Sequence, residues 1–236
     1  MAQQGKLYLL PVPITEENGH RFIPTYNSGI IKGLKKFIVE DAKTARRFLK
    51  GFEYPSIQDA ELLLLNEHTK NGDLSSLLTP LLNGEDVGLM SDAGCPGIAD
   101  PGAEVVKLAH QKGVHVIPLV GPSSIVLSIM ASGFNGQNFA FVGYLPIDKI
   151  QKTRRLRELE QIALKQKQAQ FFIETPYRNE QMLENLLESL SPQTFLFIGK
   201  DISSPNQYLV SKTVAEWKKG PKLAMHKVPV VYGIYQ

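Results

Sequence analysis

Short apolar runs alternate with amphipathic stretches along the first half of this chain. Runs typical of β-strands occur at residues 6–12, 37–39, 62–65, 86–90 and 114–120, and helical patterns lie between them at 41–49, 73–82 and 102–112. The four leucines at 62–65 fit a buried strand or a helix end, and we favour the strand. Strands that alternate with helices of about 10–12 residues predict βαβ units and a parallel sheet.

The second half of the chain follows a different pattern. Residues 125–130 are apolar on all sides, which predicts a buried helix. Strands are then expected at 139–144, 170–174, 195–199, 207–210 and 227–235, with helices at 149–166 and 179–190 and a short helix around Trp217. Strands that follow one another without a full helix between them favour a mixed sheet. We therefore expect an α/β protein with two α/β domains, residues 1–119 and 120–236, and a hinge near residue 120.

The sequence SDAGCPGIADPG at residues 91–102 is the most informative segment, and we call it the clasp loop. It follows a predicted strand, and open α/β sheets bind their ligands at the carboxyl ends of strands. Its three glycines let the backbone approach a ligand closely. An alternative is a simple helix start, with Asp100 as N-cap and Pro101 at the first helical position. That interpretation leaves residues 92–97 unexplained.

Composition narrows the functional class only slightly. The chain has 26 basic and 23 acidic residues, so a net charge of +3 neither requires nor excludes a nucleic-acid partner. No apolar run approaches the roughly 20 residues of a membrane span, and the first residues lack a signal-peptide pattern. We expect a soluble, cytoplasmic protein with no membrane partner.

The cysteine and histidine content argues against a metal site. Cys95 is the only cysteine, so the chain forms no internal disulfide, and no base accompanies it locally, which favours a packing role over nucleophilic catalysis. The five histidines show no helix-face or HExxH spacing. We expect no metal.

The helix expected at 149–166 and the residue that follows it are strongly charged. The basic residues are Lys149, Lys152, Arg154, Arg155, Arg157, Lys165 and Lys167, set against Glu158 and Glu160. Such a run is most simply a solvated helix face. The alternative is a surface that contacts RNA phosphates.

Six segments together resemble a known family. In chain order they are LYLLPVPI (7–14), VEDAK (39–43), the clasp loop, VGPSS (120–124), GYLP (143–146) and ETPYR (174–178). In this order and over nearly the whole chain they resemble the tetrapyrrole methylase superfamily of S-adenosylmethionine-dependent methyltransferases. The likeness is greatest to the branch that methylates a ribose 2′-hydroxyl of small-subunit ribosomal RNA.

The resemblance implies a tetrapyrrole methylase-like fold, a homodimer that acts on ribosomal RNA or the small ribosomal subunit, and S-adenosylmethionine held in a cleft between the two domains. Carried over residue by residue, it implies the following donor-binding set: Pro13, Ile14, Ser91, Asp92, Ala93, Gly94, Ile98, Ala99, Ser123, Ser124, Tyr144, Leu145, Tyr177, Val230 and Val231.

A hydroxyl acceptor would gain from a general base. The candidates are Glu40, Asp41, His68 and Asp100, and the sequence does not choose among them. Asp41 has an equally good reading as the N-cap of the helix that follows it. His68 fits a solvated helix or loop end at least as well.

Two departures from the family pattern keep alternatives open. Thr15 and Glu16 stand where the branch has Gly-Asn after the first strand, and Lys43 replaces an arginine, which keeps the charge but loses the bidentate fork. One alternative is therefore methylation of a tetrapyrrole or other small-molecule acceptor. Another is a catalytically inactive S-adenosylmethionine-binding protein. A nicotinamide-dependent dehydrogenase is disfavoured, because no GxGxxG follows the first strand.

Overall fold

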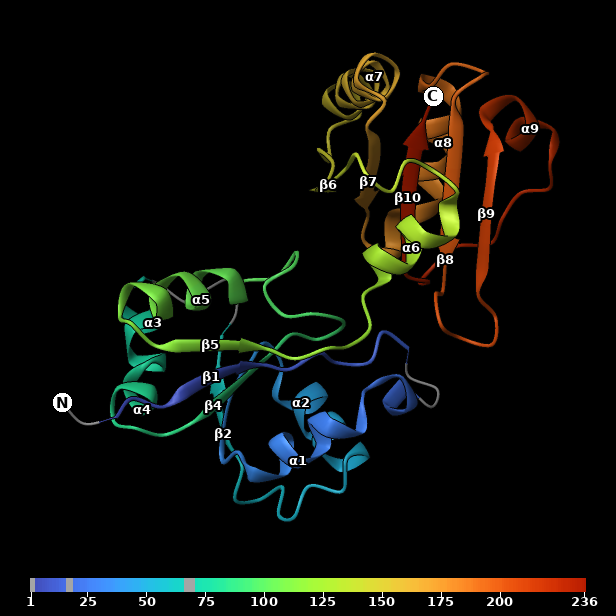
Figure 1. Cartoon of the computed structure of the whole chain (residues 1–236). Helices are drawn as coiled ribbons and strands as arrows, with labels where there is room; N and C mark the ends of the chain where they lie inside the picture. The colour runs from blue at the N-terminus through green and yellow to red at the C-terminus, as the bar shows by residue number, and fades with distance from the viewer. Residues whose placement is uncertain (1–2, 16–18, 66–70) are drawn as a thin grey trace. The chain divides into compact units, whose positions relative to one another are not determined.

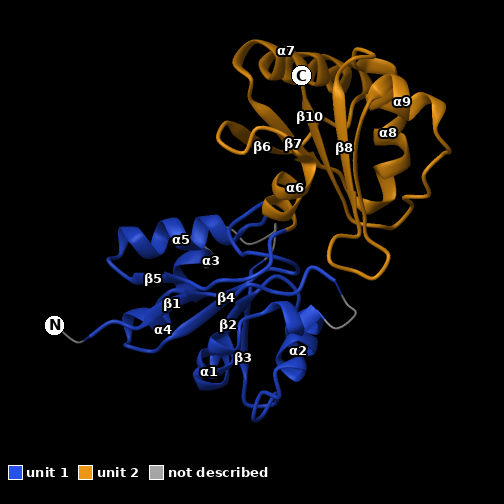
Figure 2. Ribbon diagram, turned by 45° about the vertical axis from the view of Figure 1, so that its right-hand side comes forward, with its two compact units in different colours: residues 1–123 blue, residues 124–236 orange. Residues whose placement is uncertain are grey.

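A computed structural model describes residues 3–15, 19–65 and 71–236 of the chain. The chain forms two compact units, Met1–Ser123 and Ser124–Gln236, which we call unit 1 and unit 2 (Figure 2). The sequence pattern had placed the boundary slightly earlier, after residue 119. The alternation of strands and helices is interrupted at residues 120–124, VGPSS. Unit 2 begins at Ser124, which is the last residue of that segment and the first residue of the next helix.

Unit 1 contains a five-stranded parallel sheet (Figure 1). Its strands are β1 (Lys6–Leu9), β2 (Lys36–Val39), β3 (Glu61–Leu64), β4 (Val87–Met90) and β5 (His115–Pro118), in the order β3-β2-β4-β1-β5. Every pairing between them is parallel. The predicted parallel sheet is confirmed, as is the choice of a strand for the leucine run.

Helices cover both faces of this sheet. The 3-10 turn η1 (Gly19–Phe22) leads into α1 (Thr25–Gly33), which packs with α2 (Ala42–Gly51) over one face, around Phe37 and Val39. The other face carries α3 (Asn71–Leu77), α4 (Thr79–Leu82) and α5 (Gly102–Gln111), around Ile38 and Leu89. Successive residues of β2 thus point into opposite cores, as the pleat of a strand requires.

The single helix predicted at 73–82 is wrong. Two helices, α3 and α4, cover this stretch, and they are separated at Leu78. Pro80 lies in the first turn of α4. Since proline has no backbone N–H and its ring clashes with the preceding turn, the chain begins a new helix here rather than continuing the first.

Unit 2 contains a five-stranded mixed sheet. Its strands are β6 (Phe139–Tyr144), β7 (Ala169–Ile173), β8 (Phe195–Lys200), β9 (Tyr208–Thr213) and β10 (Val230–Tyr235), in the order β6-β7-β10-β8-β9. Only β6 and β7 pair in parallel, and the other pairings are antiparallel. The mixed sheet predicted for the second half of the chain is confirmed.

Three helices share one core with the unit 2 sheet, namely α7 (Lys149–Gln166), α8 (Asn179–Ser189) and α9 (Val214–Lys219). Their starts are set locally. The Asp148 carboxylate accepts a hydrogen bond from the Gln151 backbone N–H at 2.9 Å, and Thr213 forms a capping box with Glu216 at the start of α9. Such caps satisfy N–H groups that a helix cannot pair internally. A 3-10 turn, η2 (Pro176–Arg178), precedes α8.

The first helix of unit 2, α6 (Ser124–Ser132), packs against β9 and β10. The expectation that it is buried on all sides is wrong, because Val126 is 53% and Met130 is 74% exposed. Ser128 and Ser132 are instead the residues that it buries. Small side chains let a helix backbone approach a sheet closely, and the Ser211 hydroxyl donates to the Ser132 carbonyl at 2.6 Å. The larger apolar residues are left outside.

Two glycine-to-alanine substitutions in unit 1 are expected to have opposite effects on stability. A Cβ on Gly88 of β4 would lie 2.6 Å from Leu10 Cδ1 and 2.9 Å from Phe37 Cδ1. Gly88→Ala should therefore overpack the core and lower the free energy of unfolding by about 1–3 kcal/mol. A Cβ on Gly29 meets nothing within 4 Å. Gly29→Ala should therefore raise the helix propensity of α1 and stabilise by about 0.5–1 kcal/mol. Urea unfolding followed by circular dichroism measures both; equal effects would contradict the packing described.

Candidate active site

The segments that follow β1, β2, β4 and β5 meet at the carboxyl edge of the unit 1 sheet. Val12 and Gly94 form an isolated antiparallel bridge, in which each backbone N–H donates to the other residue's carbonyl, at 2.8 and 3.0 Å. The Asp92 N–H donates to Glu40 Oε1 at 3.1 Å. The Cys95 thiol contacts the Pro122 carbonyl oxygen at 3.4 Å. The clasp loop is thus tied to each of the other three segments.

Inside the clasp loop, three residues have left-handed backbone conformations. They are Gly94 (φ 76°), Gly97 (φ 86°) and Ala99 (φ 62°). Glycine adopts this conformation freely, whereas alanine pays a steric penalty. The loop therefore holds Ala99 in an unfavourable conformation, which requires strong constraints from its surroundings.

Asp100 supplies those constraints. Its carboxylate accepts hydrogen bonds from the backbone N–H of Gly97 at 2.9 and 3.0 Å and from that of Gly102 at 2.7 Å. The N-cap residue of α5 is Pro101, one residue later than predicted, although Asp100 still accepts from the first amide of the helix. With both oxygens engaged by the backbone, Asp100 organises the loop, and this weakens its candidacy as a general base.

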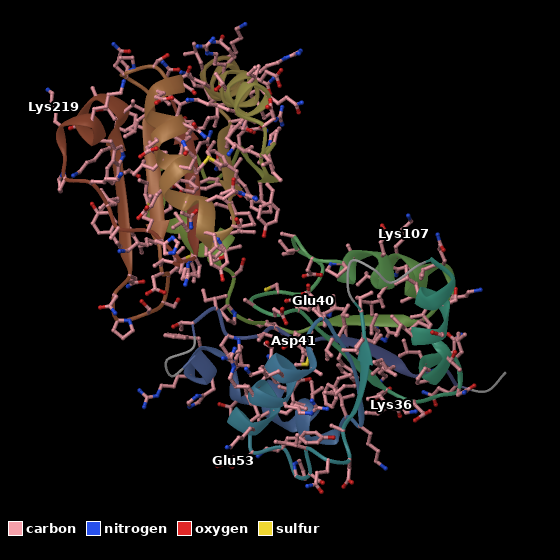
Figure 3. All side chains as sticks on the ribbon, turned by 180° about the vertical axis from the view of Figure 1, so that it is seen from behind. Lys36, Glu40, Asp41, Glu53, Lys107 and Lys219 are labelled. Carbon is pink, nitrogen blue, oxygen red and sulfur yellow. The ribbon has the colours of Figure 1, made fainter. Side chains whose placement is uncertain are left out.

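The other candidate bases fare differently. Glu40 and Asp41, both labelled in Figure 3, directly follow β2. Asp41 is the N-cap of α2, and the hydrogen bond from the Thr44 N–H lowers the pKa of its carboxyl. Burial raises the pKa of the Glu40 carboxyl. The hydrogen bond from the Asp92 backbone N–H lowers this pKa, whereas repulsion from Asp100 and Asp92 raises it further. Glu40 is thus the better proton acceptor of the two. His68 lies outside the described residues.

A pocket of about 340 Å³ opens beside these carboxylates in unit 1. It is lined by four members of the donor-binding set, Pro13, Ile14, Asp92 and Ala93, and by residues that the motif comparison missed: Val12, Thr15, Gly19, His20, Thr44, Arg47, Phe48, Gly51 and Phe52. Four of these nine residues belong to α2, namely Thr44, Arg47, Phe48 and Gly51. A helix that starts at the carboxyl edge of a sheet places its first turns beside any site at that edge. The helix predicted directly after the second strand could therefore have indicated these residues in the sequence.

Asp92 is the carboxylate that reaches this pocket. Burial raises its pKa, repulsion from Asp41 raises it further, and the nearby Arg47 guanidinium opposes both. Burial and a like charge together favour the protonated form of a carboxyl, which is how perturbed groups arise at functional sites.

The remaining unit 1 members of the donor-binding set lie near the pocket or along the clasp loop. Ser91 is buried, and its hydroxyl donates to the Ala93 carbonyl at 3.1 Å. Ile98 and Ala99 are exposed on the outer part of the loop. Ser123 ends the segment that follows β5.

The unit 2 members divide into exposed and buried residues. Tyr144 at the end of β6 is 54% exposed, and Tyr177 in η2 is 70% exposed. Leu145, Val230 and Val231 are each 4% exposed, so their side chains belong to the protein interior. Any ligand contact that these three make would therefore involve the backbone. Ser124 begins α6.

The ETPYR segment contains a buried charge network. Glu174 Oε1 accepts from Arg178 Nη2 at 2.6 Å and from the Thr175 N–H at 2.8 Å, and Glu174 Oε2 lies 3.5 Å from Lys152 Nζ. Burial alone would raise the pKa of Glu174, but the hydrogen bonds from Arg178 and Thr175 and the charges of Arg178 and Lys152 outweigh it and hold the pKa below its ordinary value. Glu174 is therefore ionised.

This network corrects the description of α7 as a uniform charged face. Lys152 is buried against Glu174 and does not reach solvent with the other basic residues. Arg154 and Arg155 both pair with Glu158, at 3.1 and 3.3 Å. One glutamate of α7 thus partly neutralises two of its arginines, and Lys149 pairs with Glu188 of α8 at 3.1 Å.

Cys95 lies in the clasp loop and is partly buried. Burial raises the pKa of the Cys95 thiol, which makes it a poor nucleophile at neutral pH. Within residues 3–15, 19–65 and 71–236, no group of three or more histidine, cysteine, aspartate or glutamate residues is arranged to hold a metal ion. Over the same described residues, no helix is long and apolar enough to cross a membrane.

The two-unit architecture is that of known methyltransferases. The structure resembles the methyltransferase CobJ, with a TM-score of 0.65 and 14% identity over 98% of this chain and 94% of that one. It also resembles the uroporphyrin III C-methyl transferase from Thermus thermophilus, with a TM-score of 0.59 and 16% identity over 98% of both chains. At such low identity these likenesses define the fold, which is the tetrapyrrole methylase fold.

The chain is also similar in sequence to named ribosomal RNA methyltransferases. A ribosomal RNA small subunit methyltransferase I from Halalkalibacterium halodurans is 32% identical over 78% of this chain and 60% of its own length. The protein of the same name from Bacillus subtilis is 29% identical over 91% of this chain and 70% of its own length. The chain thus spans less than two thirds of the first of these two relatives. No protein-family model matches the chain.

We expect Asp100→Ala to open the clasp loop. Removing the carboxylate leaves the N–H groups of Gly97 and Gly102 without their acceptor, and hydrogen bonds to charged groups contribute about 1.5–3 kcal/mol. Hydrogen exchange should become faster at both amides. The control is Asp148→Ala, which removes a single cap bond on α7 and should cost about 1 kcal/mol without changing exchange in the loop. Unchanged exchange at Gly97 in Asp100→Ala would contradict the role given to Asp100.

Proposed function

We propose that this protein is an S-adenosylmethionine-dependent methyltransferase that methylates a ribose 2′-hydroxyl of small-subunit ribosomal RNA. The observation that carries the proposal is the similarity to ribosomal RNA small subunit methyltransferases I, which extends over 78–91% of the chain in the two relatives described above. The aligned family motifs also come together in the fold, with the clasp loop bound to the segments after β1, β2 and β5.

The chemistry of the clasp loop suits this methyl donor. S-adenosylmethionine supplies an electrophilic methyl group on a sulfonium, so it carries positive charge at its reactive centre and no phosphate. Residues 91–102 contain no lysine or arginine and two aspartates, and Glu40 binds the loop from below. A cradle for phosphate would instead present cationic groups. The unit 1 members of the donor-binding set therefore remain our proposal for this site.

The chain's own groups would position the acceptor and receive its proton. Methyl transfer is an in-line displacement, and holding the two reactants in line at about 3–3.5 Å supplies much of the acceleration. Glu40 and Asp92 are the carboxylates whose pKa is raised at this edge, and Glu40 keeps its Oε2 for a proton while its Oε1 accepts from the Asp92 N–H. A raised pKa makes a carboxylate a stronger general base.

We also propose that the protein acts in the cytoplasm as a homodimer. The exposed Val126 and Met130 lie four residues apart on α6, hence on one helix face, and they form an apolar surface of the kind that assembly buries. A substrate in the small ribosomal subunit places the activity where ribosomes are assembled.

A transfer assay tests the function directly. Purified protein is incubated with tritiated S-adenosylmethionine and either small ribosomal subunits or porphyrinogens, and label should appear only in the ribosomal RNA. Alkaline hydrolysis should then leave the label in a dinucleotide, because the phosphodiester that follows a 2′-O-methyl ribose cannot be cleaved through a cyclic phosphate. Label in porphyrinogens would favour the small-molecule alternative, and cofactor binding without transfer to either would favour the inactive binding protein.

A matched pair of aspartates tests the donor site. Asp92 follows β4 at the carboxyl edge, whereas Asp86 precedes it and accepts a hydrogen bond from the Lys6 N–H at 2.8 Å. We expect Asp92→Asn to lower the affinity for S-adenosylhomocysteine at least about tenfold, or 1.4 kcal/mol, by calorimetry. Asp86→Asn keeps its acceptor oxygen and should bind as the wild type does. Equal affinities in the two variants would move the donor away from the clasp loop.

A further inference from the structure

An exposed tyrosine stands on a turn at one end of the unit 2 sheet. Tyr177 lies in η2, directly after β7, and is 70% exposed. Its ring makes an edge contact with the His226 ring, with centroids 6.2 Å apart and an interplanar angle of 75°. Lys227 Nζ lies 5.9 Å from the centroid of the same ring. A large aromatic surface is thus presented to solvent beside a cation.

The turn beneath Tyr177 is held by the buried charge network. Glu174 and Arg178 bracket the turn and are joined by a two-pronged interaction, at 3.0 Å from Nε and 2.6 Å from Nη2 to the same carboxylate oxygen. Lys152 approaches the other oxygen from α7. Lys152 and Glu174 are buried, whereas the Arg178 side chain is 37% exposed. Burying a charge pair is costly and adds little stability over an apolar core, so we attribute to this network the geometry that it fixes. Here that geometry is the turn that carries Tyr177.

The segment that carries His226 and Lys227 is attached to the same turn. The Lys227 N–H donates to the Pro176 carbonyl at 3.0 Å, and Asn179 Nδ2 donates to the Val228 carbonyl at 2.6 Å. The Tyr232 hydroxyl in turn donates to the Asn179 carbonyl at 3.0 Å. Both parts of the aromatic surface are therefore fixed to each other and to β10. A rigid aromatic group loses little entropy when a ligand binds to it.

Sheet register places a second exposed aromatic residue at the same edge. Tyr144 is paired with Ile173, the last residue of β7, and Val231 near the start of β10 is paired with Ile173 from the other side. The ends of β6 and β7 and the beginning of β10 therefore lie together. The exposed Tyr144 and Tyr177 both belong to this edge.

We propose that Tyr177, His226 and Lys227 form a platform on which an unpaired base of the RNA substrate stacks. The proposal rests on the proposed function. Proteins that bind single-stranded RNA combine aromatic rings, on which bases stack, with cations that follow the phosphates. Tyr177 supplies the ring and Lys227 the cation. The buried carboxylate of this region, Glu174, is neutralised by Arg178 and Lys152 and does not repel phosphate.

The same charges argue against the donor as the occupant of this surface. The family resemblance places Tyr177 among the donor-binding residues, but a sulfonium is positive, and Lys227 lies beside the Tyr177 ring. A cation bound against the Tyr177 ring would be repelled by the Lys227 ammonium, whereas a phosphate would be attracted to it. The acceptor strand therefore fits this platform better than the donor does.

The test compares Tyr177→Ala with Tyr177→Phe in the full chain. Base stacking on one aromatic ring contributes roughly 1–3 kcal/mol, so Tyr177→Ala should weaken binding of transcribed small-subunit ribosomal RNA and of oligoadenylate by about 5- to 150-fold. Tyr177→Phe keeps the ring and should bind within about twofold of the wild type, as expected for stacking without hydrogen-bond readout. Both variants should bind S-adenosylhomocysteine as the wild type does. Thermal unfolding checks that they are folded.

A second variant tests the cation independently of the ring. Lys227→Gln should weaken RNA binding and reduce the slope of log affinity against log salt by about one, the change expected for one lost phosphate contact. Wild-type RNA affinity in both Tyr177→Ala and Lys227→Gln would overturn the platform. Loss of S-adenosylhomocysteine affinity in Tyr177→Ala would also overturn it, and would assign the residue to the donor. Failure of the wild-type protein to bind either RNA would instead count against the proposed function itself.

Discussion

The two hydrogen bonds between Val12 and Gly94 join the segment after β1 to the clasp loop after β4. The strands before them, β1 and β4, are parallel neighbours in the sheet, whereas the bridge is antiparallel, so the clasp loop has reversed its direction by the time it pairs with Val12. Gly94 reaches this position with a positive φ, which turns the clasp loop back across the sheet edge. The contacts with Glu40 and Pro122 and the backbone bonds of Asp100 all depend on the path that this bridge imposes.

The two units solve the problem of fixing a loop in different ways. In unit 1, one carboxylate at Asp100 binds backbone N–H groups, so a single acidic side chain holds several residues of a loop without a counter-ion. In unit 2, Glu174 binds two cations from separate elements, α7 and η2, and fixes a turn by charge pairing in the protein interior. The first arrangement leaves a loop that contains two aspartates and no basic residue. The second leaves an aromatic side chain exposed above a neutralised interior, beside Lys227.

Several features of the fold followed from local pattern alone. The leucine run at 62–65 supplies three of the four residues of β3, as expected of a short apolar run bounded by polar residues, although β3 lies at the edge of the sheet and is only partly covered. The last helical residue of α7, Gln166, and both ends of β6 agree with the periodicity. The break at Leu78 was missed because the helical pattern continues through Pro80, and a hydrophobic period does not register the loss of one backbone donor.

The site was less accessible to sequence reasoning. Arg47 and His20 carry no motif, and they reach the pocket because α2 and η1 happen to flank the segment after β1. Lys152 is indistinguishable in sequence from its solvent-facing neighbours on α7, and only its position opposite Glu174 reveals it as a buried partner.

Sequence alone determined the class of fold, the order of the elements and the identity of the clasp loop, since these depend on periodicity, turn residues and the spacing of motifs along the chain. The tertiary structure decided which side chains are engaged and which remain available. Asp41 and Asp100 are occupied by backbone N–H groups, Lys152 is buried, and Tyr177 is exposed on a fixed turn. These outcomes depend on partners distant in sequence or on the path of the loop. Whether a side chain is buried or hydrogen-bonded depends on the groups that folding brings next to it, and its own position in the sequence does not specify those groups.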